Sequence, residues 1–298
     1  MANLEVVREI HPAARIASNV KIGPYCVIGE HVTIGPNTTI GRHVTVSGHT
    51  SIGSGNFIDD GCVIGVLPQD LKYRGSDTLM VVGHNNTICR NVTMHIGTET
   101  GGYVTRVGNG NIFREGSHVA HDCFVDNDCE IGKNVQLAGH ILVQDGAVIE
   151  ALSGVHHFVT IGRYSRVGPR TPVRRDVPPF TNFYSEDYGW TPPSVRGINH
   201  KGISDANLKP DEEAELRRAL YELFDDEAAL QTKIEQLVDL GMEGEAAALC
   251  EFCQNSLRGK FGRIREYYRG KIPPEAVPHL SEEKLAELKR QGIDEAQL

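Results

Sequence analysis

The chain has 298 residues, which is long enough for one large domain or two of ordinary size. Hydrophobic residues make up 40% of it and charged residues 23%, a balance that excludes a disordered chain. The formal net charge of −9 argues against general nucleic-acid binding. No apolar run approaches the ~20 residues that span a bilayer, and the first ten residues lack a signal peptide's apolar core. The 7 scattered cysteines are an odd number, so a reducing, cytoplasmic location is expected rather than a disulfide framework.

An aliphatic residue returns every six positions along the first part of the chain. The pattern starts at Ile10, and glycine often follows the aliphatic residue, as at Gly23. It shifts by one residue after Met94, resumes at Val107 and continues to Val173. An α-helix of 3.6 residues per turn does not keep this period on one face. A parallel β-helix does, because each repeat supplies one short strand and one turn, and three repeats close a triangular coil. The glycines are expected to supply turn conformations that a side chain disfavours.

Two polar segments interrupt the repeat and are expected to form loops, at residues 68–81 and 97–106. Loops longer than a turn on a rigid scaffold are often functional. The repeat ends near Pro178, because proline cannot continue a sheet ladder. The β-helix is therefore expected over residues 1–180, with a linker over residues 181–207.

Residues 208–298 are expected to form a C-terminal α-helical domain. Proline and acidic residues begin this region at Pro210, as is common at a helix N-terminus. Apolar residues then recur at helical spacing: Leu216, Leu220, Leu223, Leu230, Ile234 and Leu237. Cys250 and Cys253 have the spacing of a zinc or redox pair, but they share a helical face with apolar residues, which favours a place in the core.

Histidines gather in the second half of the repeat, at His118, His121, His140, His156 and His157. His121 and His157 hold the same position of the repeat two coils apart, so their side chains should lie on one side of the prism. Asp122 follows His121, and a carboxylate that orients an imidazole is the usual partner of a general base. Solvated surface histidines, a zinc site and a catalytic site are all possible interpretations. Several histidines on one side favour catalysis.

Five arginines near the end of the repeat stand out in an acidic protein: Arg163, Arg166, Arg170, Arg174 and Arg175. They form either a solvated face or a docking site for an acidic partner or a phosphate. The residues alone do not decide between the two.

The chain resembles the acyl-[acyl carrier protein]–UDP-N-acetylglucosamine O-acyltransferases that begin lipid A biosynthesis. The segments QDLKY, HVAHDC, LAGH, VHHF and DVPPF occur in the family's order, and the resemblance covers nearly the whole chain. It implies a left-handed coil, which is an exception to the right-handed crossover rule. It also implies a homotrimer that moves a (3-hydroxy)acyl group from acyl carrier protein to the 3-hydroxyl of UDP-N-acetylglucosamine. The carrier's thioester is then the co-substrate, and no metal or other cofactor is required.

The resemblance also implies roles for individual residues. His121 would be the general base, Asp122 would hold its imidazole, and the N–H of Gly139 would stabilise the oxyanion. The implied substrate contacts are Asp70, Lys72, His118, His140, His156, His157 and Asn199. Pro169 stands where the family limits acyl-chain length, which implies a shorter or redirected acyl pocket. The arginine set would bind the acidic carrier protein.

Three residues depart from the family pattern near the expected diphosphate site. Lys201 replaces an acid, and Asp205 and Ala206 replace two arginines. A different sugar nucleotide or a sugar amine is therefore an alternative acceptor. A metal-dependent hydratase of the γ-carbonic-anhydrase type and a non-catalytic trimeric scaffold are the remaining alternatives, because both use the same β-helix.

Overall fold

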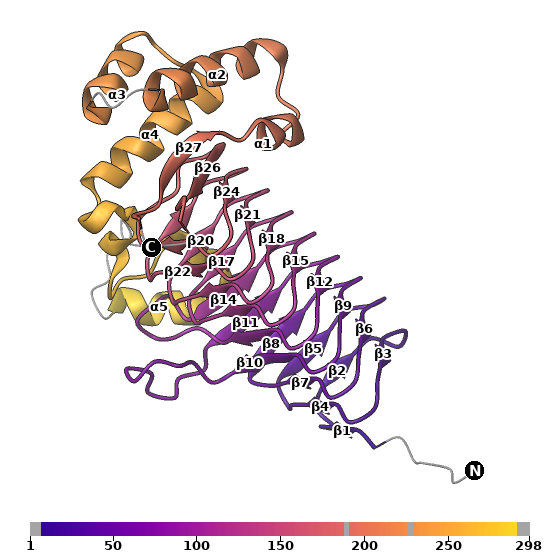
Figure 1. The fold of residues 1–298 in the computed structure, drawn as a ribbon. Coiled ribbons are helices and arrows are strands. Elements are labelled where there is room, and N and C mark those ends of the chain that lie inside the picture. The colour runs from indigo at the N-terminus through magenta and orange to yellow at the C-terminus, as the bar shows by residue number, and fades with distance from the viewer. Residues whose placement is uncertain (1–6, 188–190, 226–228, 291–298) are drawn as a thin grey trace.

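The computed structural model describes residues 7–187, 191–225 and 229–290. Three sheets form the sides of a triangular prism, and every neighbouring strand pair is parallel except β26–β27 (Figure 1). The first sheet contains β1 (Glu9–Ile10), β4 (Val27–Ile28), β7 (Thr45–Val46), β10 (Val63–Val66), β13 (Thr93–His95), β16 (His118–Val119), β19 (Gln136–Leu137), β22 (Gly154–Val155) and β25 (Pro172–Val173). The second contains β2 (Arg15–Ile16), β5 (Val32–Ile34), β8 (His49–Ile52), β11 (Leu79–Val82), β14 (Val104–Val107), β17 (Phe124–Val125), β20 (Leu142–Val143) and β23 (Thr160–Ile161). The third contains β3 (Lys21–Ile22), β6 (Thr39–Ile40), β9 (Phe57–Ile58), β12 (Thr87–Ile88), β15 (Ile112–Phe113), β18 (Glu130–Ile131), β21 (Val148–Ile149), β24 (Arg166–Val167), β26 (Thr181–Tyr184) and β27 (Ser194–Ile198).

The glycine that follows the aliphatic residue adopts the expected turn conformation at Gly65 (φ 77°), but it has a different purpose at Gly53 and Gly83. Gly53 and Gly83 lie outside the left-handed region, which is occupied two residues later, for example by Asn85 (φ 57°). A Cβ at Gly53 would lie only 2.5 Å from the carbonyl oxygen of Gly83 in the next coil. Glycine is therefore needed here because successive coils approach closely, and not because of its backbone freedom.

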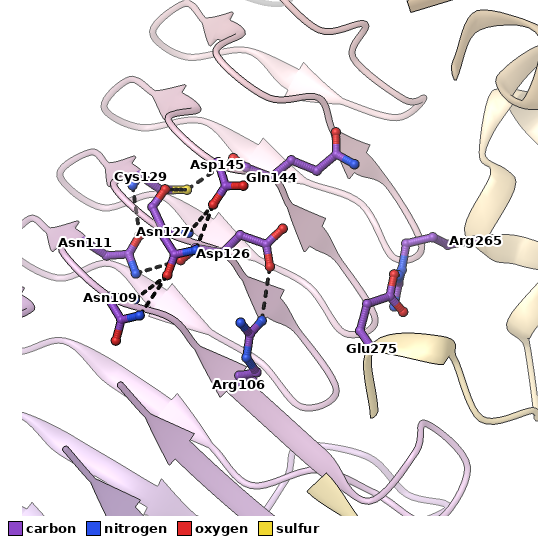
Figure 2. Close-up of polar contacts among 10 residues, drawn as sticks. All are labelled: Arg106, Asn109, Asn111, Asp126, Asn127, Cys129, Gln144, Asp145, Arg265 and Glu275. Carbon is purple, nitrogen blue, oxygen red and sulfur yellow. Dashed lines mark hydrogen bonds and ion pairs between the residues drawn. The ribbon is translucent and has the colours of Figure 1, made fainter. Parts of the chain in front are cut away.

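Polar side chains link successive coils at the corner between the second and third sheets (Figure 2). The side-chain amide of Asn109 donates to Oδ1 of Asn127 at 3.1 Å, and that of Asn127 donates to Asp145 at 2.9 Å. Deeper in the turn, Asn111 accepts from the backbone N–H of Cys129 at 2.8 Å. These ladders satisfy turn groups that the short strands leave without partners.

Two loops leave the prism, at residues 67–78 and 96–103. They are shorter than expected because β11 and β14 already begin at Leu79 and Val104. The loop that follows β10 projects away from the prism (Figure 1).

The stretch expected as a linker, residues 181–207, instead adds two strands to the third sheet and a short helix, in the parts that the structure describes (181–187 and 191–207). β26 pairs with β24, β27 pairs back on β26, and the short helix α1 (His200–Asp205) follows. The physical reason is apolar burial, because Phe180 and Phe183 are at most 2% exposed and extend the core past the proline pair. This stretch therefore caps the prism.

The C-terminal region is helical, as expected. α2 (Pro210–Phe224), α3 (Leu230–Asp239) and α4 (Gly244–Arg258) share a core that contains Cys250 and Cys253, which confirms a packing role for both cysteines. The chain then returns along the prism through the 3₁₀ turns η1 (Lys260–Gly262), η2 (Ile264–Tyr268) and η3 (Pro274–His279) to α5 (Glu282–Arg290) (Figure 1). Within the described ranges, none of the helices is long and apolar enough to cross a membrane.

Candidate active site

His121 and Asp122 lie in the turn after β16, at the corner between the first and second sheets. Nδ1 of His121 is 2.7 Å from Oδ2 of Asp122. Because a carboxylate only accepts, Nδ1 carries the hydrogen, and Nε2 keeps the lone pair that a general base needs. Asp122 occupies the left-handed turn position of its repeat (φ 59°), so the fold fixes the pair.

Asp122 is completely buried and is held by a residue that sequence reasoning missed. The backbone N–H of Thr98 donates to Oδ1 at 2.7 Å, and its hydroxyl donates to Oδ2 at 2.6 Å. Burial raises the pKa of the Asp122 carboxyl, and the hydrogen bonds from His121 and Thr98 oppose that shift. Thr98 belongs to the 96–103 loop, so the interruption of the repeat was the available signal, although it did not point to this residue.

Gly139 packs directly against the ring of His121. A Cβ on Gly139 would lie 2.6 Å from Cε1 of His121, a separation that side chains do not tolerate. In the described part of the chain, no hydrogen-bond acceptor engages the N–H of Gly139. This donor is therefore available to an oxyanion next to the base.

His140 lies behind His121 rather than in the open. Its ring stacks on Phe158, with centroids 4.3 Å apart, and its Nδ1 is 3.8 Å from Oδ2 of Asp122. Burial and the nearby His121 lower the pKa of His140 to about 2, so its imidazole is neutral at physiological pH.

A groove of about 410 Å³ runs along the first sheet, and the largely buried His121 is among its lining residues. Its lining includes His118, His121, Gly139, His156, His157 and Arg174. Nδ1 of His118 is 2.7 Å from the Thr93 hydroxyl, and burial lowers the pKa of His118 to about 4. The structure thus brings together four of the five predicted histidines, with His140 outside the lining.

The loop at residues 67–78 contributes to this groove through a residue that was not predicted. Gln69 lines the groove, whereas Asp70 and Lys72 are not among the lining residues. The backbone N–H of Lys72 donates to Oδ1 of Asp70 at 2.9 Å, and Leu71 between them is fully exposed. This part of the loop points away from the chain's own groove.

Pro169 and Asn199 lie on a different side of the prism from His121. Both line a second cavity of about 920 Å³ along the third sheet. The side chain of Asn199 donates to the carbonyl of Tyr164 at 2.8 Å, which fixes the start of α1. Within one chain, these two predicted residues are therefore not brought to the base.

Two of the residues near Asn199 that differ from the family pattern carry opposite charges. Lys201 and Asp205 form an ion pair one turn apart on α1. Together these two substitutions therefore add no net positive charge near Asn199.

The five arginines do not form one surface. Arg163 pairs with Glu245 of α4 at 2.6 Å, and Arg166 pairs with Glu150. Arg170 occupies a left-handed turn position (φ 55°). Arg174 and Arg175 line a further cavity of about 890 Å³, which also contains Lys260, Arg263 and Arg269.

Among the described residues, one group has the spacing to hold a metal ion: His121, Asp122 and His140, whose ligand atoms lie within 4.8 Å of one another. Both oxygens of Asp122 already accept hydrogen bonds, one of them from Nδ1 of His121. A shared ion would have to break that bond, so the donor set fits a base held by a carboxylate better than a metal centre.

Two family models match the chain. One, described as bacterial transferase hexapeptide (six repeats), matches residues 13–48. The other, described as UDP N-acetylglucosamine O-acyltransferase, domain 2, matches residues 176–261. The acyl-[acyl-carrier-protein]–UDP-N-acetylglucosamine O-acyltransferase of Xylella fastidiosa is 45% identical over 215 residues, which cover 72% of this chain and 80% of that protein. The chain belongs to this family.

Solved structures of the acyl-[acyl-carrier-protein]–UDP-N-acetylglucosamine O-acyltransferase family share the fold. LpxA from Acinetobacter baumannii superposes with a TM-score of 0.76 at 34% identity, over 87% of this chain and 98% of that chain. LpxA from Bacteroides fragilis, a UDP-N-acetylglucosamine acyltransferase, gives 0.77 at 32% identity, over 83% and 95%. The predicted resemblance and the fold class are confirmed: a left-handed parallel β-helix of hexapeptide repeats with a C-terminal helical region.

Proposed function

We propose that the protein transfers a (3-hydroxy)acyl group from acyl carrier protein to the 3-hydroxyl of UDP-N-acetylglucosamine, the first step of lipid A synthesis. The observation that carries this proposal is the His121–Asp122 pair beside the N–H of Gly139 in an open groove. The relatives of this chain are named for the same donor and acceptor.

In the proposed reaction, Nε2 of His121 takes the proton of the sugar hydroxyl while its oxygen attacks the thioester carbonyl carbon. The carbonyl oxygen becomes an oxyanion that accepts from the N–H of Gly139. Asp122 stabilises the imidazolium that forms. Collapse of the intermediate breaks the carbon–sulfur bond, and the departing thiolate takes the proton back from His121. The cycle balances without a metal or other cofactor.

The sugar nucleotide is proposed to lie along the first sheet. His118, in the same coil as His121, and His156 and His157, two coils further on, line the groove on either side of His121. Their ring nitrogens can bond sugar hydroxyls and phosphate oxygens. The Lys201–Asp205 pair weakens the case for the usual diphosphate site, so another sugar nucleotide remains the alternative acceptor.

The active form is proposed to be a homotrimer. Asp70, Lys72, Pro169 and Asn199 lie away from the groove of their own chain. A neighbouring prism would complete each groove with the projecting 67–78 loop and the third-sheet cavity. Pro169 would then limit the acyl chain from that side.

The carrier protein is proposed to dock beside the groove on a basic surface formed by Arg174, Arg175 and Lys260. Arg263 and Arg269 line the same cavity, but both pair with Glu266. His156 and Arg174 line both this cavity and the groove, so the two are continuous. Acyl carrier proteins are acidic, which complements the surface. Arg163 and Arg166 pair with acidic residues of their own chain, so they are not part of the proposed docking surface. The cytoplasm, where such carriers and reduced thiols occur, is the proposed location, and all seven cysteines are free.

The direct test is mass-spectrometric detection of acylated product. The protein is incubated with UDP-N-acetylglucosamine and a panel of 3-hydroxyacyl carrier proteins of different chain length, with and without chelator. We expect product for one range of chain lengths, unaffected by the chelator. No product with this acceptor but product with another sugar nucleotide would contradict the acceptor, and activity that depends on added zinc would contradict the mechanism.

A further inference from the structure

The chain beyond η1 packs against the corner that carries the base. This tail segment, residues 263–280, lies past the end of the matched domain model at residue 261. Its Ile272 and Ala276 are buried against Phe124 and Leu142 of the second sheet. Apolar burial therefore anchors the tail at the height of β17 and β20, the strands that follow the turns of His121 and His140.

Arg265 places a guanidinium under the turn that contains Gly139 and His140. Its side chain is only 3% exposed, and its Nε donates to the carbonyl oxygen of His140 at 3.0 Å. Its Nη1 lies 2.7 Å from Glu275 of the same tail, and Figure 2 shows the two side chains between the tail and the prism. A buried arginine with a paired charge and hydrogen bonds from two of its nitrogens holds a fixed position.

Arg269 contacts the corresponding turn of the next coil, which contains Phe158. Its guanidinium lies over the ring of Phe158, 4.3 Å from the centroid. Phe158 stacks on His140, and the edge of that imidazole meets His121, with centroids 5.1 Å apart. The tail thus ends a continuous stack that leads to the catalytic ring.

The Ala138 side of the turn is held by the thiol of Cys123, which donates to the carbonyl of Ala138 at 3.0 Å. The N–H of His140 donates to the carbonyl of His121 at 3.1 Å, and the N–H of Phe158 donates to the carbonyl of Gly139 at 3.3 Å. These bonds are longer than the usual 2.9–3.0 Å, whereas the buried arginine adds a charge-assisted bond to the next carbonyl. The tail therefore supports the His140 end of the turn, next to the peptide that carries the Gly139 N–H.

We infer that the tail segment is a positioning element for acyl transfer, in which Arg265 and Arg269 hold the Gly139–His140 turn against His121. Neither arginine touches the reacting atoms in this account. The inference rests on the proposed function for its kinetic part only, because the packing of the turn is a property of the protein alone.

The test uses the full chain with Arg265→Gln, and Arg106→Gln is the matched control. Arg106 also pairs with an acid at the second sheet, Asp126 at 3.1 Å, and Figure 2 shows this pair apart from Arg265. We expect Arg265→Gln to lower kcat about 10- to 100-fold while KM for the sugar nucleotide changes less than about threefold. Arg265→Lys, which keeps one donor, should recover part of the loss. The control should stay within about twofold of wild type.

A second readout needs no substrate. Hydrogen exchange at the amide of His140 should become at least about tenfold faster in Arg265→Gln and stay unchanged in Arg106→Gln. Unchanged exchange together with an unchanged kcat would overturn the inference. If Arg265→Gln does not fold, Arg269→Ala is used instead, because the Arg269 side chain is 55% exposed and its loss should be tolerated. A kcat of Arg269→Ala within about twofold of wild type would then refute a positioning role for the Arg269–Phe158–His140 stack. If the wild-type protein forms no product, the proposed function is rejected. The hydrogen-exchange result still shows whether Arg265 holds the Gly139–His140 turn.

Discussion

Replacing Gly139 by alanine isolates the contact between the oxyanion donor and the base. The new Cβ would lie 2.6 Å from Cε1 of His121, and ordinary contact begins near 3.4 Å, so the ring or the turn must move by about 0.8 Å. A ring movement of that size directly away from Asp122 lengthens the 2.7 Å bond to about 3.5 Å, at the limit of a hydrogen bond. A misplacement of about 1 Å costs about 10²-fold in rate, or about 2.7 kcal/mol in activation free energy.

The assay is steady-state kcat for product formation, with the circular dichroism spectrum and Tm to establish that Gly139→Ala folds. Overpacking of this kind should also lower the free energy of unfolding by about 1–3 kcal/mol. Gly154→Ala is the matched control, because its Cβ meets nothing within 4 Å in the same groove. We expect the control to keep kcat within about threefold. A folded Gly139→Ala protein with wild-type kcat would refute the assigned contact.

Three further predictions concern the groups around the base. Asp122→Asn should lower kcat about 10³- to 10⁴-fold, because an amide no longer fixes the tautomer of His121, and a loss below tenfold would argue against the pair. Thr98→Val should lower the free energy of urea unfolding by about 1.5–3 kcal/mol, because the buried carboxylate loses a hydroxyl donor; unchanged stability would contradict this. The pKa of His140, lowered to about 2, predicts stability that is complete above pH 6.5 and lost as the pH falls. Wild type should therefore lose about 1.4 kcal/mol more per pH unit between pH 6 and 4 than His140→Asn, and equal slopes would count against it.

The sequence was most informative where the structure is periodic. The six-residue spacing predicted the stacked coils because each repeat makes the same contacts with the repeat one coil away. It also placed His121 and His157 on one groove, since two coils separate them. The same regularity misled the interpretation of glycines such as Gly53, because close approach between coils leaves no trace in the local pattern.

Contacts between distant segments were not predictable in the same way. Thr98 reaches Asp122 from a loop, and Arg265 reaches His140 across 125 positions of sequence, without any shared spacing. Residues 181–207 were expected as a linker because prolines usually end a sheet, and no pattern in the sequence indicated that the apolar core continues around Phe183. Sequence patterns report repeated and local interactions, whereas these contacts depend on how the chain folds back on itself.

The central claim is that His121, oriented by Asp122, is the base for acyl transfer. The most direct measurement is kcat of His121→Ala beside the Kd of the same protein for UDP-N-acetylglucosamine, measured by titration calorimetry. We expect kcat to fall at least about 10³-fold while Kd changes less than about threefold, because the ring acts on the proton and not on ground-state binding. A variant that binds the sugar nucleotide and keeps more than about a tenth of the wild-type kcat would contradict the account.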